Sequence, residues 1–393
     1  MHGERSPPAT FLNTLYRSMS PPGTLLNNIN LVLQAPVIGP LLDGVFWSAM
    51  CVIAAFLAPI VLLNGMLKAY DDSSASEAQP ETRSRLGVVV TGCDSGFGRL
   101  LAIHLAQQGY TVFAGCLAPA QAGDLFNEAP AGLLRVYKMD VTSDTDVDRV
   151  AAEACKWVDE AAGRRLLAVT NNAGIGTGGP VDWLTIRDYE RDLAVNYLGV
   201  IRVTKAFLPL LRRSASDGAA AGSAQSPRVL IVSSMSGKVP VPFLSSYSSS
   251  KHAVACFAAS LRMEISALWK IHVCTALPSF HRTPLTEGGV GSITKLWGAV
   301  PQETRALYGE ACARSAFQVA DEMMSDWAWE PARVTEALAR AVTQVQPPPC
   351  ELTIGSDARF GLNVMRHLPP RIYEALIWHW IAWNLVKPAQ AYA

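Results

Sequence analysis

Short apolar runs alternate with amphipathic stretches along most of the chain from Leu86 onward. The runs are rich in valine, leucine and isoleucine and too short for separate helices, which is typical of buried parallel strands. The stretches between them carry apolar residues at helical spacing. This alternation predicts an α/β fold, a Rossmann-type doubly wound parallel sheet. The predicted strands are Leu86–Val90, Tyr110–Leu117, Leu133–Met139, Leu166–Thr170, Arg228–Ser233, Ile271–Leu277 and Glu351–Ile354.

The same pattern predicts helices between these strands. One follows a glycine-rich turn and ends at Gly109, and the others cover 142–162, 187–213 and 246–268. The stretch 214–227 (SASDGAAAGSAQSP) is low in complexity, which predicts a mobile surface loop without chemistry. A less regular segment, about 288–329, is expected to cover the ligand crevice as a substrate lid.

A different pattern occupies the N-terminal region. Gly44–Leu67 is 24 residues long and carries no charge. At about 1.5 Å per residue such a helix exceeds the roughly 30 Å hydrocarbon layer of a bilayer. It predicts a transmembrane anchor, kinked at Pro59, although a buried helix of a soluble protein is the alternative.

The basic residues near this span lie on its C-terminal side, at Lys68, Arg83 and Arg85. The positive-inside rule then places the following domain in the cytosol, unless 24–42 also enters the membrane and reverses the orientation. We expect the protein to be located in the endoplasmic reticulum membrane, with a mitochondrial membrane as the alternative. The expected organisation is an N-terminal segment 1–43, the anchor 44–67, a linker 68–85, a catalytic domain 86–356 with its lid at about 285–330, and an apolar helical segment 357–393.

The C-terminal stretch Leu368–Val386 contains three tryptophans among apolar residues. That composition suits either a membrane interface or a contact between two subunits. Over the whole chain Lys+Arg and Asp+Glu are both 33, so there is no excess of positive charge to suggest nucleic acid as a partner. The eight cysteines form no C-x-x-C pair and no cluster with histidine, so free thiols are expected rather than disulfides or a metal site.

The turn after the first predicted strand carries the first candidate chemistry. Thr91, Gly92, Gly96 and Gly98 are spaced T-G-x-x-x-G-x-G between a strand and a helix. Glycines at these positions let the backbone turn sharply and approach a pyrophosphate at the helix N-terminus. The candidate cofactor-binding residues of this turn are Thr91, Gly92, Asp94, Ser95, Gly96, Phe97 and Gly98.

A second group follows the fifth predicted strand. Tyr247 and Lys251 are four residues apart in YSSSK, so on a helix they share one face. A neighbouring ammonium favours the phenolate and is expected to lower the pKa of the phenol from its usual value of about 10. The phenol would then exchange a proton with an alcohol or carbonyl oxygen that Ser234 holds, and a nicotinamide would exchange a hydride at the same carbon.

Together these residues resemble the short-chain dehydrogenase/reductase family. The resemblance rests on TGCDSGFG, on NNAG at 171–174, on YSSSK and on the order of these motifs from about Leu86 to Ile354. It implies a catalytic tetrad of Asn196, Ser234, Tyr247 and Lys251, in which Asn196 positions a water and Lys251 also holds the nicotinamide ribose. It further implies that Thr283 touches the carboxamide. The other cofactor-lining residues that the resemblance implies are Cys116, Asp140, Val141, Asn172, Ala173, Gly174 and Pro278.

A narrower resemblance concerns VFAGCL, KMDVT, FLPLLR, PSFHRTPLT and LWGAVPQETRALYG. These stretches are similar to the subfamily that contains retinol dehydrogenases, 17β- and 11β-hydroxysteroid dehydrogenases type 2 and 3-hydroxybutyrate dehydrogenase. Two positions depart from the family pattern, since Ser279 stands where glycine is usual and His281 where an aromatic residue is common. Besides Ser234 and Tyr247, His281 is a candidate for contact with the substrate.

NAD is the expected cofactor, because no Arg or Lys stands near the end of the second predicted strand to bind the 2′-phosphate of NADP. The sequence thus predicts a membrane-anchored alcohol dehydrogenase, by resemblance a homodimer, acting on a small lipophilic substrate. A hydroxysteroid is the first expected substrate and retinol is the second. A 3-hydroxybutyrate-type substrate is a further alternative, with Arg282 as the candidate cation. The rival of another class is a non-catalytic, cofactor-binding membrane scaffold.

Overall fold

The computed structural model describes residues 80–121, 128–287, 289–326, 328–359 and 363–382. The expected anchor 44–67, the segment before it and most of the linker 68–85 lie outside these residues, as do 383–393 of the C-terminal segment. All described residues belong to one structural unit that begins at Ala78.

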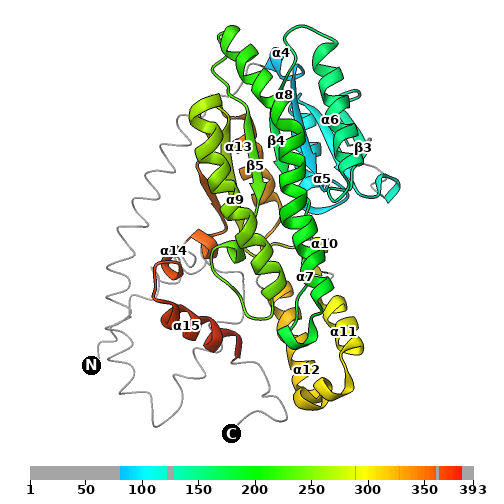
Figure 1. The fold of residues 1–393 in the computed structure, drawn as a ribbon, viewed down its shortest axis with the longest axis vertical. Coiled ribbons are helices and arrows are strands. Elements are labelled where there is room, and N and C mark those ends of the chain that lie inside the picture. Colours follow the sequence, from blue (N-terminus) through cyan, green and yellow to red (C-terminus); the bar gives the residue numbers. More distant parts are fainter. Residues whose placement is uncertain (1–79, 122–127, 288, 327, 360–362, 383–393) are drawn as a thin grey trace, which may run out of the picture. The chain divides into compact units, whose positions relative to one another are not determined.

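A seven-stranded sheet forms the centre of the fold, and all of its strand pairs are parallel (Figure 1). The strand order is β3-β2-β1-β4-β5-β6-β7, which confirms the Rossmann-type α/β fold. The strands are β1 Leu86–Thr91, β2 Thr111–Cys116, β3 Leu134–Lys138, β4 Arg165–Asn171, β5 Arg228–Val232, β6 His272–Pro278 and β7 Glu351–Ile354.

The strand order reverses at β1. Val88 pairs with Val112 of β2 on one side and with Ala168 of β4 on the other. Because successive crossovers leave β1 in opposite directions, their helices diverge and open a crevice at the carboxyl ends of β1 and β4. The fold therefore places the glycine turn and the end of β4 next to each other.

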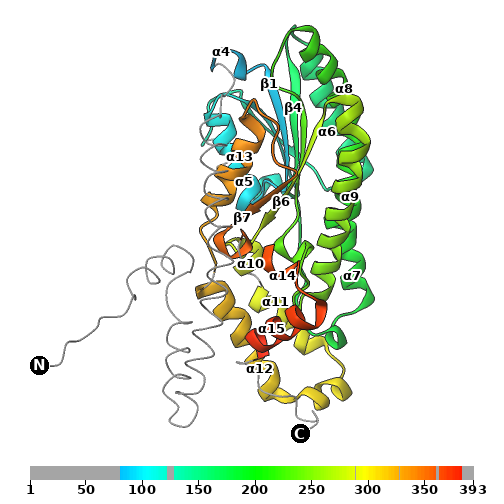
Figure 2. The same cartoon turned by 90° about the vertical axis from the view of Figure 1, so that its left-hand side faces the viewer.

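Helices cover both faces of the sheet (Figure 2). Helices α5 and α13 lie on one face, and α6, α8 and α9 lie on the other. The helices of at least eight residues are α5 Gly96–Gln107, α6 Asp144–Asp159, α7 Ile186–Leu193, α8 Val200–Ala220, α9 Ser245–Trp269, α11 Gly289–Ala299, α12 Gln302–Asp326, α13 Ala332–Thr343 and α15 Pro370–Ala382. Shorter elements are α4 Pro80–Arg83, η1 Pro119–Gln121, η3 Val181–Trp183, η4 Ala194–Gly199, η5 Met235–Gly237, α10 Pro284–Glu287 and α14 Asn363–Met365.

The helix expected over 187–213 differs from the prediction in two ways. It is interrupted by η4, a π-helical segment, and α8 continues to Ala220. The loop expected at 214–227 was therefore wrong over its first half. Alanine favours helices, and Ser214 is fully buried, where its Oγ accepts a hydrogen bond from Leu166 N at 2.8 Å. The low complexity of this stretch reflects small residues packed beside β4.

One helical stretch among the described residues, Ile186–Ala220, is long and apolar enough to cross a membrane by length and composition alone. Its mean hydropathy reaches 1.3 over 18 residues. Val203, Phe207 and Leu211 on this stretch are fully buried in the core between α8 and the sheet. Part of its apolar character therefore belongs to the core, since 39% of this apolar window is buried.

The segment expected as an irregular lid is mostly helical, since it forms α10, α11 and α12. Trp183 of η3 contacts Trp297 of α11 with ring centroids 4.6 Å apart. Trp183 also packs edge-on against Tyr308 of α12, whose hydroxyl donates to Asp182 at 2.8 Å. These aromatic contacts give the two helices a small core of their own against η3.

After β7 the chain forms α14 and α15. On α15, Ile377 is buried in a cluster with Val239, Val241 and Leu277, whereas Trp378 is 54% exposed. Ionic contacts support the same region, because Glu351 of β7 accepts from Lys238 at 2.6 Å and from Arg366 at 3.0 Å.

Arg228, the first residue of β5, is the largest fully buried side chain. Its guanidinium donates to the carbonyls of Ala341 at 3.0 Å and Gln344 at 2.8 Å, and twice to Ser226. Burial lowers the pKa of Arg228 to about 10, which leaves the side chain a cation at neutral pH. It therefore satisfies the carbonyls at the C-terminal end of α13 and joins that helix to the sheet.

We predict that Arg228→Met lowers the free energy of unfolding by about 3 kcal/mol, because one buried and two half-buried carbonyls lose their donor. Chemical denaturation measures the change. Arg187→Met, at an exposed position of α7, is the matched control and should stay within about 0.5 kcal/mol of the unmodified protein. Equal stability of the two variants would contradict the anchoring role of Arg228.

Candidate active site

In the turn after β1, two stretches of backbone at Gly92 and Gly98 approach each other closely. Gly92 and Gly96 have φ values of +70° and +59°, a region that favours glycine. A Cβ on Gly98 would collide with Gly92 O and with the side-chain nitrogen of Asn172. Because no side chain fits there, the turn has the close approach that a pyrophosphate-binding turn requires.

Hydrogen bonds join this turn to the end of β4. The hydroxyl of Thr91 accepts from the backbone nitrogens of Asn172 at 3.0 Å and Ala173 at 2.9 Å. Asn172 Nδ2 in turn donates to Thr91 O at 2.9 Å and Gly92 O at 3.2 Å. Thr91, Asn172 and Ala173 therefore hold the turn in place from behind.

The N-terminus of α5 opens onto the crevice. Its N-cap residue, Ser95, is extended and makes no side-chain capping bond, so the first amides of the helix are available to an anion. Asp94 accepts from Leu117 N at 2.9 Å and Ala118 N at 2.8 Å, and thus ties the turn to the end of β2 beside Cys116. A dinucleotide phosphate fits this arrangement of glycines and helix terminus.

The loop after β6 lies against the same turn. Thr283 is buried, and its side chain is 3.7 Å from the position of a Cβ on Gly96. His281 is 2% exposed, and its ring meets the ring of Phe97 edge-on with centroids 5.7 Å apart. Thr283 and His281 therefore lie next to the glycine turn, and Pro278 is the last residue of β6, before this loop.

The end of β3 lies farther along the crevice edge. Asp140 accepts from the backbone and hydroxyl of Thr142 at 2.8 and 2.7 Å, which shapes the turn into α6. Val141 is 6% exposed, and its carbonyl accepts from Arg202 at 2.8 Å. Both residues stay candidates for lining the cofactor site.

Asn196 lies in η4 and is fully buried. It accepts from Ile175 N at 2.9 Å and donates to Ile175 O at 2.8 Å and to Ser250 Oγ at 2.9 Å. The side chain thus links the loop after β4 to α9. The π-helical turn lets Asn196 face this loop within an otherwise regular helix, and such turns are common at functional sites.

Ser234, Tyr247 and Lys251 meet beside the same loop. The Ser234 side chain acts on the Tyr247 phenol and lowers its pKa, and Lys251 Nζ lies 5.6 Å from the Tyr247 ring centroid. Lys251 Nζ donates to Val232 O at 2.9 Å. A Cβ on Gly174 would lie 3.2 Å from Asn196 Oδ1 and 3.3 Å from Lys251 Nζ, and one on Gly176 would lie 3.1 Å from the Tyr247 ring, so these three side chains line one short stretch of backbone.

The electrostatics of the phenol differ from the expectation. Burial raises the pKa of Tyr247 above its usual value, the hydrogen bond with Ser234 lowers it in part, and the charge of Asp192 raises it again. Burial also lowers the pKa of Lys251 to about 8, against the opposing charge of Asp192. The prediction that the Tyr247 pKa is lowered is therefore wrong, because both groups lie where water solvates their charges poorly.

Several polar residues of the site lack a motif that sequence reasoning could use. Asp192 is fully buried and accepts from Thr177 and Ser246, while Ser250 bonds to Asn196. The only available signal was their spacing, since Asp192 precedes Asn196 by four residues and Ser246 precedes Ser250 by four. Helical spacing alone does not show what such residues face.

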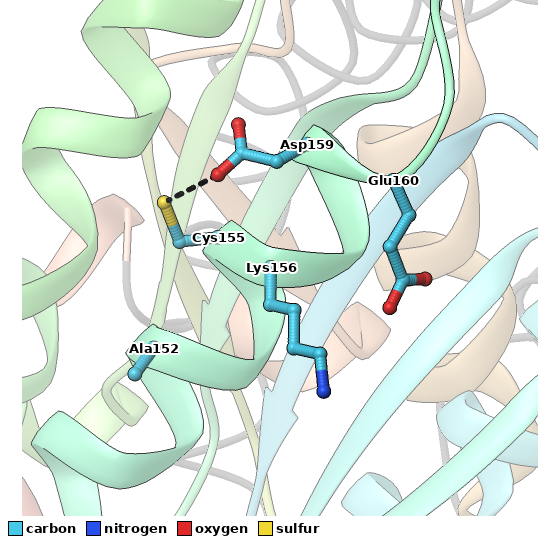
Figure 3. A pocket seen from close by; sticks show the side chains of 5 residues that line it. All are labelled: Ala152, Cys155, Lys156, Asp159 and Glu160. Carbon is cyan, nitrogen blue, oxygen red and sulfur yellow. Dashed lines mark hydrogen bonds between the residues drawn. The ribbon is translucent and has the colours of Figure 1, made fainter.

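Other hollows of the described surface lie apart from this cluster. One of about 520 Å³ is lined by Ala152, Cys155, Lys156, Asp159 and Glu160 of α6 and its end (Figure 3). There Cys155 Sγ donates to Asp159 at 3.7 Å, and Cys155 is one of seven described cysteines, all of them free thiols. A groove of about 630 Å³ lies between α9 and α15, where Ser248, Ser249 and His252 face Trp378.

The chain matches the sequence profile of the family described as short chain dehydrogenase over residues 87–289. It is 35% identical to mouse retinol dehydrogenase 5 over 77% of this chain and 90% of the relative. It is 32% identical to bovine 17-beta-hydroxysteroid dehydrogenase type 6, with the same coverage of 77% and 90%. A short-chain dehydrogenase/reductase from Burkholderia phymatum, solved in complex with NAD, superimposes with a TM-score of 0.57 at 18% identity, covering 74% of this chain and 94% of the other.

We predict that Gly98→Ala weakens binding of NADH about 10- to 100-fold, because the added methyl group collides with Gly92 O and pushes the turn away from the phosphate. Fluorescence titration with NADH measures the affinity. Gly298→Ala, where an added Cβ meets nothing within 4 Å, should bind NADH as the unmodified protein does. Unchanged binding by Gly98→Ala would place the cofactor elsewhere.

Proposed function

This chain belongs to the short-chain dehydrogenase family, and from that premise we propose that it transfers a hydride between NAD and a lipophilic alcohol or ketone at a membrane. The observation that carries this proposal is that Lys251 and Tyr247 meet the loop after β4 at Gly174 and Gly176, next to the glycine turn, with Ser234 acting on the Tyr247 phenol. A binding scaffold has no use for a phenol and an ammonium at this spacing, which favours an enzyme over that rival.

In the proposed mechanism, Ser234 donates a hydrogen bond to the substrate oxygen and orients it. The Tyr247 hydroxyl takes the proton from an alcohol or gives one to a carbonyl, and Lys251 balances the charge that develops on the phenol oxygen. Asn196 supports the backbone at Ile175 and would position a water for proton relay. NAD, when bound, supplies the hydride acceptor, held by the glycine turn, the N-terminus of α5 and Thr283.

The surroundings of the predicted ribose site favour NAD over NADP. The Asp94 carboxylate lies at the end of β2, where it would repel a 2′-phosphate. Arg99 is the nearby cation, and it acts on Cys116, but Glu128 pairs with it at 2.7 Å. A 2′-phosphate would have to compete with Glu128 for this arginine.

The proposed substrate is a hydroxysteroid or retinol, the classes that the two relatives are named for. A small hydroxy acid of the 3-hydroxybutyrate type would need a cation near the reacting carbon. Arg282 is exposed, and its guanidinium pairs with Glu330 at 3.2 Å. This ion pair makes Arg282 a poor candidate for that cation.

We predict that the purified full chain, in detergent, forms NADH from NAD with a steroid or retinoid alcohol, and does so faster than with NADP. Tyr247→Phe should lower kcat by at least about 100-fold, because the proton-transfer group is lost. Absorbance of NADH measures both rates.

The matched control is Tyr137→Phe on β3, whose ring stacks on Phe113 and should tolerate the change. Turnover that survives Tyr247→Phe would refute the role of the tyrosine. Cofactor binding without turnover of any alcohol in the panel would favour the scaffold.

The proposed membrane association rests on the uncharged stretch 44–67. We predict that the full chain stays in the membrane fraction of cells after alkaline extraction, and that Ala55→Arg with Leu62→Arg releases it, since each arginine costs about 3 kcal/mol at the bilayer centre. Ser73→Arg with Ser76→Arg in the linker is the control, because it adds the same two charges outside the uncharged stretch.

Fluorescent tagging distinguishes the endoplasmic reticulum from mitochondria. Protease added to intact microsomes should remove a C-terminal tag if the catalytic domain is cytosolic. Protection of the tag would reverse the proposed orientation.

A further inference from the structure

Two buried polar side chains project from consecutive turns of one helix. Asp192 on α7 and Asn196 on η4 are four residues apart, and both are fully buried. Asp192 Oδ2 accepts from Thr177 N at 3.1 Å and from Ser246 Oγ at 2.8 Å, and its Oδ1 accepts from Thr177 Oγ1 at 2.9 Å. Each side chain thus reaches the loop after β4 and helix α9 at once.

The contacts of Asp192 repeat those of Asn196 one turn away. Asn196 bonds to Ile175 and to Ser250, whereas Asp192 bonds to Thr177 and to Ser246. On α9, Ser246 and Ser250 are also four residues apart. Because both ladders have the same spacing, the two side chains clamp the loop to α9 at two successive levels.

The phenol lies between these two levels. Ser246 is the residue directly before Tyr247, and Thr177 directly follows Gly176. A Cβ on Gly176 would lie 3.1 Å from Cδ2 of the Tyr247 ring. Asp192 therefore holds both neighbours of the ring, one on the loop and one on the helix.

Asp192 also brings a negative charge into a region that holds a buried cation. Lys251 is 4% exposed, and its ammonium donates to a carbonyl rather than to a carboxylate. The groups that face the pair are Ser234 from the end of β5, Asn196 from η4 and Asp192 from α7. Arg191 contacts the same network, because it donates to Thr177 Oγ1 at 2.8 Å. Among the described residues, Asp192 is the charged side chain whose field reaches both Tyr247 and Lys251.

We propose that Asp192 is a positioning residue of the proton-transfer site, which clamps the two walls of the Tyr247 ring and supplies the counter-charge that keeps Lys251 protonated. The proposal rests on the proposed function, since it assigns a role within that site. Its electrostatic part has a defined sign. The negative charge raises the pKa of Lys251 against burial and raises that of Tyr247 as well, so a neutral residue at 192 lowers both.

The test compares Asp192→Asn and Asp192→Ser with the unmodified chain. We expect both limbs of the pH profile of kcat/KM for alcohol oxidation to move to lower pH by about one unit, because the coupled pair titrates together. Two neutral variants are made so that the test stands even when one of them fails to fold. Circular dichroism shows which variants are folded, and one folded variant is enough. Asp192→Glu retains the charge and should return both limbs toward their original positions.

Controls separate charge from shape. Glu190→Gln removes a carboxylate from an exposed position of the same helix and should move neither limb. Thr177→Val removes the hydroxyl that donates to Asp192 but keeps the charge, so it should lower kcat and leave the limbs in place. Limbs that stay in place in both neutral variants would overturn the electrostatic role.

A second readout does not require turnover. The ultraviolet absorbance of tyrosinate, with the Tyr247→Phe protein as background, gives the midpoint for Tyr247, and that midpoint should fall by about one unit in Asp192→Asn. An unchanged midpoint contradicts the proposal. A shifted midpoint in a protein that oxidises no alcohol would refute the proposed function and leave the role of Asp192 standing.

Discussion

The contact between the end of β1 and the end of β4 is the constraint on which the rest of the crevice depends. The Thr91 hydroxyl accepts from two successive amides after β4, and Asn172 returns two hydrogen bonds to the turn after β1. The approach is so close that Gly98 cannot carry a side chain. The loop that leaves this contact passes Gly174 and Gly176, where it meets Lys251 and Tyr247. The glycine turn and Tyr247 are thus joined by a single short stretch of backbone.

Burial of charge distinguishes the site from an exposed Tyr-x-x-x-Lys pair. On a solvated helix the ammonium would keep its ordinary pKa, but the site lowers that of Lys251 to about 8. The protein compensates with a hydrogen bond from Lys251 to a carbonyl and with the Asp192 carboxylate on a neighbouring helix. Such an arrangement lets small changes in nearby charge alter which protonation state dominates near neutral pH.

The loop after β6 and the segment that contains α10, α11 and α12 are joined by backbone hydrogen bonds at Trp329. Trp329 N donates to Phe280 O, and Arg282 N donates to Trp329 O, both at 2.9 Å. The start and end of the segment with α10, α11 and α12 are therefore paired with each other, beside Thr283 and the glycine turn. A movement of these helices would therefore displace Thr283. The segment expected as a substrate lid is in this way linked to the loop that we propose contacts the cofactor.

The local pattern of the chain determined the sheet and the order of its strands in sequence, because β-branched runs and glycine turns act over a few residues. It also determined which residue types carry the chemistry, and the structure brings Asn196, Ser234, Tyr247 and Lys251 together. Tertiary structure alone decided the helical state of 214–220, where burial of Ser214 beside β4 outweighs a loop-like composition. It also decided the role open to Asp192, because a buried carboxylate and an exposed one look alike in sequence. The raised pKa of Tyr247 has the same origin, since desolvation depends on every element packed around the ring and not on the lysine four residues away.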